Sequence, residues 1–263
     1  MPKLSLCVPV FNRFDLAMRC VAALQATVPA GLAEIIVGDD CSPDGNACEW
    51  FPQGIALTSF RNEHNLGYSG NCNEMAKRAR GDFLVFINSD AMALPGWWEP
   101  MLRLFESTQV GVVGPKLIQP NGRIQSCGGL YDRNRGPYHR HLGCLRTWRH
   151  ANVTERVSWI TGAVMMTPRL FFLELGGFAG TAYPNGYFED VDYCEKVKTR
   201  GLEVWYCHEA EFTHIVGQST SSKVRNFQDQ LRAHDSFMRN SFTFHKRWDK
   251  AIVPDVKGLY VNY

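Results

Sequence analysis

The chain has 263 residues, of which 45% are hydrophobic and 21% charged, and its formal net charge is +2. This composition excludes a disordered chain and a fibre, and no apolar run reaches the roughly 20 residues of a membrane-spanning helix. Proteins whose main partner is a nucleic acid usually have an excess of basic residues, and this chain is nearly neutral. No nucleic-acid partner is therefore expected. The opening sequence MPKLSLCVPVFNR has too short an apolar stretch for a signal peptide.

Nine cysteines are scattered along the chain, and no CxxC pair occurs. An odd number of cysteines in a chain of this length argues against a disulfide framework and indicates a reducing compartment. The expected location is therefore the cytoplasm, with a peripheral contact at the inner face of the membrane left open.

The first half alternates between short apolar runs and segments with helical spacing. Asn12 and Asp15 are placed to cap the first helix, and Gly81 follows the second as a stop signal. Strands are predicted at residues 4–10, 35–38, 55–60, 83–87 and 110–113, and helices near 16–24, 69–80 and 97–105.

Repeated strand–helix–strand units predict an α/β fold with a mostly parallel central sheet and helices on both faces. Polar clusters follow three of the predicted strands: Asn12-Arg13, Asp39-Asp40 and Asn88-Ser89-Asp90. Because ligands bind beyond the carboxyl ends of the strands in such sheets, these clusters should meet at one edge and form a site.

The second half is less regular. Residues 128–150 are rich in Gly, Arg and His without a clear period, which predicts an exposed loop or a short hairpin. After this segment the sequence predicts an apolar run at 157–166, helices at 168–175 and 190–199, a strand at 204–207 and an amphipathic helix at 223–245.

The usual nucleotide fingerprints are absent. The first strand is followed by VFNRFD rather than GxGxxG, and no GxxxxGK[ST] occurs, which excludes a dinucleotide fingerprint and a P-loop. Acidic residues occupy the strand ends instead, and carboxylates there suit hydrogen bonds to a base or ribose, or a hard divalent cation.

Six segments resemble the family-two glycosyltransferases of the GT-A fold, most closely their rhamnosyltransferase-like branch. In chain order they are VPVFNR, GDDCSPDG, NLGYSGNCNEM, FINSDA, TGAVMM and YFEDVDYCEKVKTRG. The resemblance implies a single GT-A-type domain at residues 1–220, with a nucleotide-binding half at about 1–115 and an acceptor-side half at about 116–220. Residues 221–263 are expected to form a C-terminal helical extension packed on that domain.

The resemblance also implies which residues hold a nucleotide-diphospho-sugar donor, with a UDP- or dTDP-sugar expected. Asp39 matches the family residue that accepts a hydrogen bond from the pyrimidine ring, although a turn or helix-cap role ahead of Ser42 remains open. The implied donor-side set is Pro9, Phe11, Asn12, Arg13, Asp39, Asp40, Asn65, Gly67, Asn73, Asn88 and Ser89.

The segment Asn88-Ser89-Asp90 occupies the place of the family's DxD motif, but Asn88 replaces the first Asp. One carboxylate, Asp90, then remains to hold Mn²⁺ or Mg²⁺ together with the donor's phosphates. His214 lies where related transferases supply a further metal ligand, and a purely structural histidine is the alternative.

The pair Glu189 and Asp190 is implied to carry the chemistry. Asp190 matches the family's general base, and its place at a predicted helix start favours ionisation but also fits a simple cap. Glu189 is the alternative base or an acceptor-holding residue. Trp159, Thr161 and Gly162 resemble the stretch that lines the acceptor side. The implied activity is an inverting, metal-assisted transfer to a hydroxyl of a glycan or lipid-linked glycan.

Several alternatives remain open at this level. His139, His141 and Cys144 form HxHxxC, a possible zinc motif without a second cluster to complete it. The arginines at 133–149 predict either a solvated loop or a mobile arm that grips the donor diphosphate or an anionic acceptor. A nucleotidyltransferase would need a Gly- and Arg-rich loop after the first strand, and a catalytically silent sugar-binding protein would lack the acidic pairs.

Overall fold

A computed structural model describes residues 2–51, 53–54, 56–184, 186–215 and 227–255. The elements of the first half are β1 (Leu4–Val10), α1 (Phe14–Thr27), β2 (Ala33–Asp39), α2 (Ala47–Trp50), β3 (Leu57–Arg61), α3 (Gly67–Arg78), β4 (Phe83–Ile87), β5 (Ala91–Ala93), α4 (Trp98–Leu104) and β6 (Val110–Ile118). Those of the second half are β7 (Ile124–Ser126), β8 (Gly129–Tyr131), β9 (Pro137–His139), the 3-10 helix η1 (Arg149–Ala151), β10 (Glu155–Arg156), β11 (Val164–Pro168), α5 (Arg169–Glu174), α6 (Glu189–Thr199), β12 (Glu203–His214) and α8 (Phe227–Trp248).

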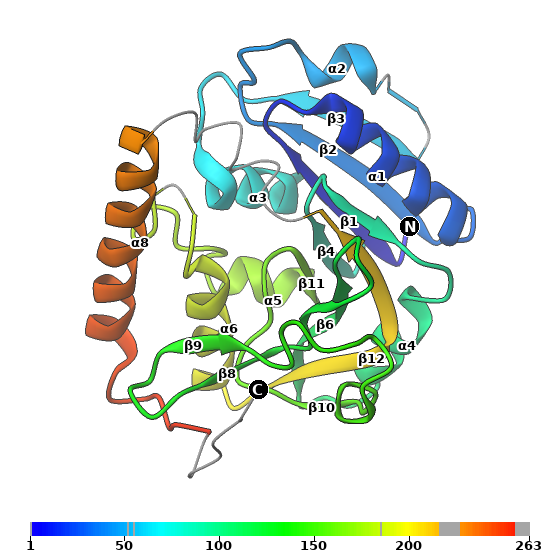
Figure 1. Ribbon diagram of the computed structural model, residues 1–263. Coiled ribbons are helices and arrows are strands. Elements are labelled where there is room, and N and C mark those ends of the chain that lie inside the picture. Colours follow the sequence, from blue (N-terminus) through cyan, green and yellow to red (C-terminus); the bar gives the residue numbers. More distant parts are fainter. Residues whose placement is uncertain (1, 52, 55, 185, 216–226, 256–263) are drawn as a thin grey trace.

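One large sheet runs through the molecule in the order β10-β12-β6-β11-β4-β1-β2-β3 (Figure 1). The strands β4, β1, β2 and β3 are parallel to one another, and β6 is parallel to β12. Between these two groups lies β11, which is antiparallel to both β4 and β6. The predicted α/β fold with a mostly parallel sheet is confirmed, and the antiparallel strand joins its two parts.

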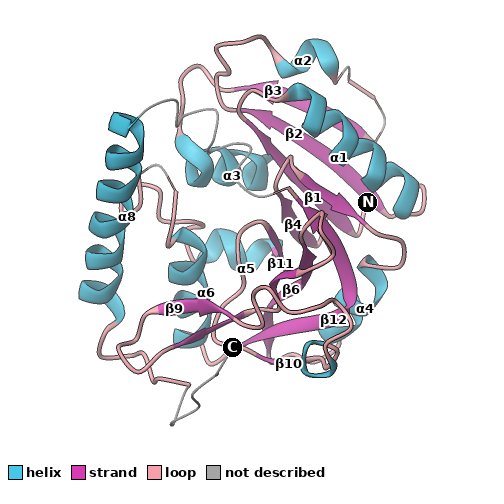
Figure 2. Cartoon of the chain, viewed as in Figure 1, coloured by secondary structure: helices cyan, strands magenta, loops and turns pink. Residues whose placement is uncertain are grey.

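Helices cover both faces of the sheet, as predicted (Figure 2). Along β4, Leu84 and Phe86 belong to one buried apolar cluster, which includes residues of α3, α5 and α6. Val85 and Ile87 point the other way, into a second cluster with residues of α1 and α4. Successive side chains of a strand face opposite sides, so a strand that is apolar at every position is what two covered faces require.

The predicted polar edge is present. Val10 pairs with Asp39 in the register of β1 and β2, and β4 ends at Ile87 on the same side. The residues that follow these three strands therefore come together, and this edge carries the site described below.

The start of α1 differs from the expectation. The cap position is Arg13, which has a left-handed backbone, and no side chain caps the helix. Asn12 instead accepts a hydrogen bond from the backbone N–H of Asp44, and Asp15 forms an ion pair with Arg13 at 3.0 Å. Asn12 bonds to the neighbouring loop and Asp15 to Arg13, so the predicted capping roles of Asn12 and Asp15 are wrong.

Several element bounds also differ. Helix α3 begins at Gly67, two residues before the predicted start, and ends at Arg78, before the expected stop at Gly81. Strands β6 and β12 are nine and twelve residues long, well beyond the predicted apolar runs. They pair with each other, so tertiary contacts extend them through Gly, Pro and charged positions. The start of the predicted tail helix at 223–226 lies outside the described residues.

The cysteines are all free in the structure, and six of the nine are buried. No helix in the described ranges combines the length and apolar character needed to span a bilayer.

Candidate active site

A cavity of about 320 Å³ opens at the polar edge of the sheet. Its walls are formed by the ends of β1, β2, β4 and β12 and by the starts of α3 and α6. The lining residues are Pro9, Val10, Phe11, Asp40, Asn65, Gly67, Tyr68, Asn71, Asn88, Ser89, Gln125, Thr161, Gly162, Ala163, Gly186, Tyr187, Glu189, Asp190 and His214. Most of the predicted site residues are therefore brought to one place.

The wall formed by β2 and α3 is held by a buried carboxylate. Asp40 is 4% exposed, and its Oδ1 accepts hydrogen bonds from the Leu66 backbone N–H at 2.8 Å and from Asn62 Nδ2 at 3.1 Å. Gly67 has a φ of 71°, a conformation that glycine adopts without strain, and its N–H donates to Asn65. The loop before α3 is thus fixed against the end of β2.

Asp90 and His214 form a buried pair, of which His214 lines the cavity. Strand β12 pairs with β5 so that His214 lies opposite Ala91, and the N–H of Ile215 donates to the Asp90 carbonyl. Both side chains are buried, and His214 Nε2 lies 3.0 Å from Asp90 Oδ1. The other ring nitrogen, Nδ1, lies 2.7 Å from Gln125 Oε1.

This pair fits a divalent cation. Two adjacent ligands of an octahedral ion, each at about 2.1 Å, lie about 3 Å apart, which matches the separation of His214 Nε2 and Asp90 Oδ1. A carboxylate with an imidazole suits Mn²⁺, whereas Mg²⁺ prefers oxygen alone. Within the part of the chain that the structure describes, no group of three or more His, Cys, Asp or Glu side chains could hold a metal. A cation at the pair would therefore need further ligands from a bound molecule or water.

Glu189 and Asp190 form the first turn of α6 and face the cavity. Asp190 Oδ2 accepts from the Gly162 N–H and Oδ1 from the Val191 N–H, each at 2.8 Å. Glu189 is 7% exposed, and its Oε2 has no hydrogen-bond partner among the described residues. One carboxyl group is thus fixed by the backbone, while the other keeps an uncommitted oxygen in a buried position.

Burial is the largest influence on the pKa of both carboxyl groups. Loss of solvent, and then the neighbouring charge of Asp190, raise the pKa of Glu189 to about 8. Burial also raises the pKa of Asp190, opposed by hydrogen bonds from Gly162 and Val191. Desolvation therefore opposes the ionisation of Asp190 that the helix start and the backbone hydrogen bonds favour. Since the Asp190 carboxylate accepts the two backbone bonds, it is the better site for the negative charge, and Glu189 keeps the proton.

Six predicted residues are not among those that line the cavity, and Asp39 is the clearest case. It is fully buried, and its two oxygens accept from Ser42 N–H and Oγ and from Ala47 N–H and Arg61. With both oxygens used by the chain itself, Asp39 stabilises the loop after β2. The structure supports the alternative turn role for this residue, and Asp40 takes its place at the cavity.

Four more of these residues form hydrogen bonds or ion pairs outside the cavity. Asn12 bonds to the loop after β2, and Arg13 pairs with Asp15. Asn73 exchanges hydrogen bonds with the backbone of Phe178, and buried Trp159 donates to the Leu130 carbonyl. Asp90 is absent from the lining as well, but it contacts His214, which belongs to it.

Several lining residues were not predicted. Tyr68 and Asn71 lie within NLGYSGNCNEM, and their spacing of three places them on one face of α3, which is a usable signal. Tyr68 also donates to the Gly162 carbonyl at 2.6 Å, beside Asp190. Tyr187 opens the motif YFEDVDYCEKVKTRG, which is also a usable signal, whereas Gln125 reaches the cavity through tertiary folding and no local pattern marks it.

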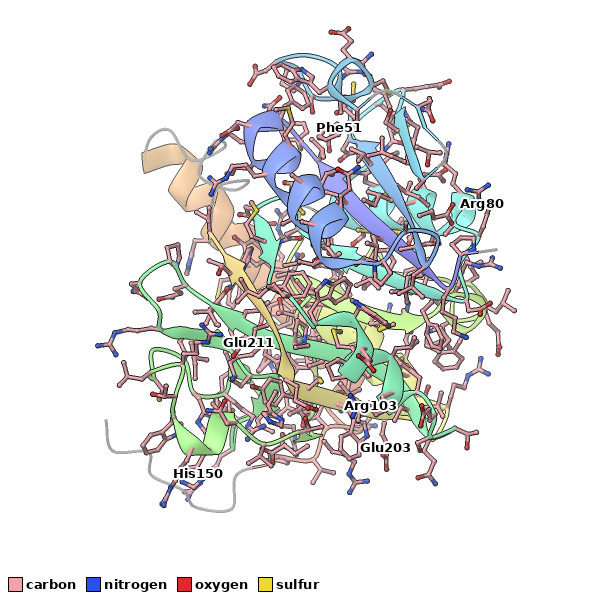
Figure 3. All side chains as sticks on the ribbon, turned by 90° about the vertical axis from the view of Figure 1, so that its right-hand side faces the viewer. Phe51, Arg80, Arg103, His150, Glu203 and Glu211 are labelled. Atoms are coloured by element: carbon pink, nitrogen blue, oxygen red, sulfur yellow. The ribbon has the colours of Figure 1, made fainter. Side chains whose placement is uncertain are left out.

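The Arg- and His-rich segment forms the hairpin β8–β9 and a loop through η1. Arg140 pairs with Glu155 at 2.6 Å, Arg135 with Asp249 at 3.2 Å, and Arg146 with Glu211. Figure 3 shows His150 at the outer edge of the molecule, with Glu211 further inward. Of the residues at 133–150, none is among those lining the cavity in the described structure. The prediction of a mobile arm on the donor is therefore not supported, because three arginines are already held by carboxylates.

The HxHxxC motif has a structural explanation. His139 Nδ1 lies 3.0 Å from Ser126 Oγ, its ring packs against Trp159, and burial lowers its pKa to about 4. The absence of a metal-binding cluster in the described residues gives the zinc alternative no support.

Comparison with known proteins places this site in context. A family model described as "Glycosyl transferase family 2" matches residues 5–160. Among curated proteins, an uncharacterized protein y4gI of Sinorhizobium fredii is 26% identical over 258 residues, covering 94% of this chain and 28% of that protein. An N-acetylglucosaminyl-diphospho-decaprenol L-rhamnosyltransferase of Mycobacterium tuberculosis is 26% identical over 247 residues, covering 82% and 77%. This chain thus spans only about a quarter of y4gI.

The fold has solved counterparts. A crystal structure of GalNAc-T7 with UDP, GalNAc and Mn²⁺ superposes with a TM-score of 0.67 at 16% identity, covering 95% of this chain and 51% of that one. At this identity the likeness shows the fold alone, and it confirms the GT-A-type fold that the motifs implied. With the family match over more than half of the sequence, the chain belongs to glycosyl transferase family 2.

Proposed function

We propose that this protein transfers a sugar from a nucleotide-diphospho-sugar to a hydroxyl group of a glycan or lipid-linked glycan. One observation carries the proposal: a single cavity is lined by Glu189, Asp190 and His214, and His214 contacts the buried Asp90 with which it forms a metal-compatible pair. The first pair suits a diphosphate leaving group, and the second suits deprotonation of a hydroxyl. Family membership and the rhamnosyltransferase relative support the same class.

The donor half of the cavity lies between the ends of β1 and β2 and the start of α3. Asp40 is fixed there as an acceptor, and Asn65 and Gly67 present polar backbone and amide groups. Such groups suit the base and ribose of a nucleotide. We infer a UDP- or dTDP-sugar, in line with the UDP bound to GalNAc-T7.

Mn²⁺ or Mg²⁺ at Asp90 and His214 would supply positive charge to the donor's diphosphate as the glycosidic bond breaks. Asp90 Oδ1 and His214 Nε2 would hold it. Gln125 contacts Nδ1, so it orients the ring with Nε2 toward Asp90. Asn88 and Ser89 line the same wall and offer neutral hydrogen-bonding groups in place of a second carboxylate.

Asp190 and Glu189 have different roles toward the acceptor hydroxyl. The Asp190 carboxylate takes the proton from the acceptor hydroxyl as its oxygen attacks the anomeric carbon. The bond from that carbon to the diphosphate oxygen breaks on the opposite side, so the configuration inverts in one displacement. Glu189, which keeps its proton because of its raised pKa, donates a hydrogen bond that holds the acceptor.

The test is a panel of UDP-, dTDP- and GDP-sugars incubated with Mn²⁺ or Mg²⁺ and a polyprenyl-diphosphate-linked sugar acceptor. Release of the nucleotide diphosphate and mass of the glycosylated acceptor are measured. Asp190→Asn should abolish most transfer, whereas Asp82→Asn, a matched change at an exposed carboxylate, should not. Nucleotide release and transfer that are equal in wild type and Asp190→Asn would contradict the proposal.

A further inference from the structure

The Glu189–Asp190 pair follows a strained piece of backbone. Tyr187 and Phe188 have φ values of 68° and 74°, a left-handed conformation that is unfavourable for a residue other than glycine. Two such residues in succession persist only where surrounding contacts hold them. They set the direction in which α6 begins, and so they set where the two carboxyl groups point.

Helix α8 contacts this backbone just before the pair. Asn240 is 2% exposed, and its Nδ2 donates to the Gly186 carbonyl at 2.6 Å. The same nitrogen lies 3.3 Å from the Tyr187 carbonyl oxygen and 3.5 Å from that of Pro184. The buried side-chain amide of Asn240 therefore contacts three backbone carbonyl groups of the segment that leads into α6.

Aromatic side chains of α8 pack against the same segment. The Phe237 ring lies 5.8 Å from that of Tyr187 and 5.3 Å from that of Phe188, measured between centroids. The Phe244 ring also packs against Phe188, with 5.4 Å between the ring centroids. Phe188 and Phe244 are buried, whereas Tyr187 and Phe237 meet at the surface, and these ring contacts oppose the return of the two left-handed residues to an ordinary conformation.

Helix α8 contacts α6 again just after the pair. Asp192 is fully buried, and its Oδ1 accepts from Trp248 Nε1 at 2.7 Å and forms an ion pair with Arg247 Nε at 2.9 Å. Figure 1 shows α8 at the edge of the molecule, beside the chain that leads into α6. The two attachments thus flank Glu189 and Asp190 along the sequence.

We propose that α8 holds the acidic pair in its reactive orientation, with Asn240 and Trp248 as positioning residues that do not touch the substrate. This inference rests on the proposed function for its catalytic consequence, but its structural part does not. The attachments act on backbone carbonyls and on Asp192, so their removal should displace the pair while leaving the donor-side wall unchanged. A displacement of about 1 Å at a reacting group lowers the rate by roughly 100-fold.

The experiment compares Asn240→Ala and Trp248→Phe with Thr243→Ala in the full chain. Trp248→Phe removes the Nε1–H with the pyrrole part of the indole but keeps an aromatic ring, so it retains part of the apolar packing if Asn240→Ala weakens the fold. Thr243 bonds only to the Arg239 carbonyl of its own helix in the described structure, which makes it the matched control. Hydrogen exchange of the backbone amides at 187–192, UDP affinity in the presence of Mn²⁺, and kcat and KM for transfer are measured for each variant.

In both test variants we expect amide exchange at 187–192 to rise by about tenfold, with exchange in β1, β2 and β4 unchanged. We expect kcat to fall by about 10- to 100-fold while UDP affinity and the KM for donor stay within twofold. Unchanged exchange at 187–192 would overturn the inference, and so would a loss of UDP affinity as large as the loss of kcat. If wild type shows no transfer, the exchange result still decides the positioning role, and only the proposed function fails.

Discussion

Replacing Asp190 by Asn tests the acidic pair directly. The change keeps the size and shape of the side chain but removes its ability to take a proton. In the structure the two carboxylate oxygens accept separate hydrogen bonds, from Gly162 and from Val191. An amide has one oxygen, so Asn can satisfy only one of these N–H groups and turns its own NH₂ toward the other.

Two magnitudes follow from this geometry. Loss of the proton acceptor should lower the transfer rate by roughly 10²–10⁴-fold, which raises the activation free energy by about 2.7–5.4 kcal/mol. The unpaired N–H should lower the free energy of unfolding by about 1–3 kcal/mol. Relief of a buried negative charge offsets part of that loss, so the variant should fold and bind nucleotide.

The assay pairs this variant with Glu189→Gln. Transfer is followed by release of the nucleotide diphosphate, binding of UDP by titration calorimetry, and unfolding by urea. Glutamine donates a hydrogen bond as a protonated Glu189 does, so it should cost less in rate than Asp190→Asn and more in the acceptor's KM. Equal UDP binding with the larger rate loss at Glu189 would exchange the two roles, and a rate loss under tenfold at Asp190 would refute the base assignment.

Three further outcomes are expected. Asp90→Ala should abolish metal-dependent turnover and weaken Mn²⁺ binding in the presence of UDP, measured by electron paramagnetic resonance; turnover that survives both this change and EDTA would remove the metal role. Because the pKa of Glu189 rises from 4.5 to about 8 on folding, its stabilising contribution is full below pH 4.5 and is lost as pH rises through about 8. The melting temperature of the wild type should therefore fall relative to that of Glu189→Gln as the pH rises from 4.5 to about 8. Melting temperatures that change in parallel with pH in the two proteins would contradict the raised pKa. Arg149→Ala should leave UDP affinity unchanged at low and high salt, since the residue does not line the cavity, and a tenfold loss would restore a donor role for that segment.

The sequence by itself determined the core of the fold. Strands such as 83–87 are apolar at every position, and only a sheet covered on both faces buries all of them. The parallel arrangement then brings strand ends together, so the positions of Asp40, Asn88 and Ser89 at one edge follow from the pattern. The motif at 187–201 likewise identified Glu189 and Asp190, because their order and spacing are local properties.

Tertiary structure alone decided which polar residues face the cavity. Asp39 and Asp40 are adjacent and chemically identical, yet the loop after β2 uses both oxygens of Asp39 and leaves Asp40 at the wall. Gln125 reaches the site because β7 pairs with β6, and Asn240 reaches the start of α6 because α8 packs there. The ionisation of Glu189 also depends on desolvation by distant segments. These features arise from contacts between residues far apart in the chain, which no local pattern encodes.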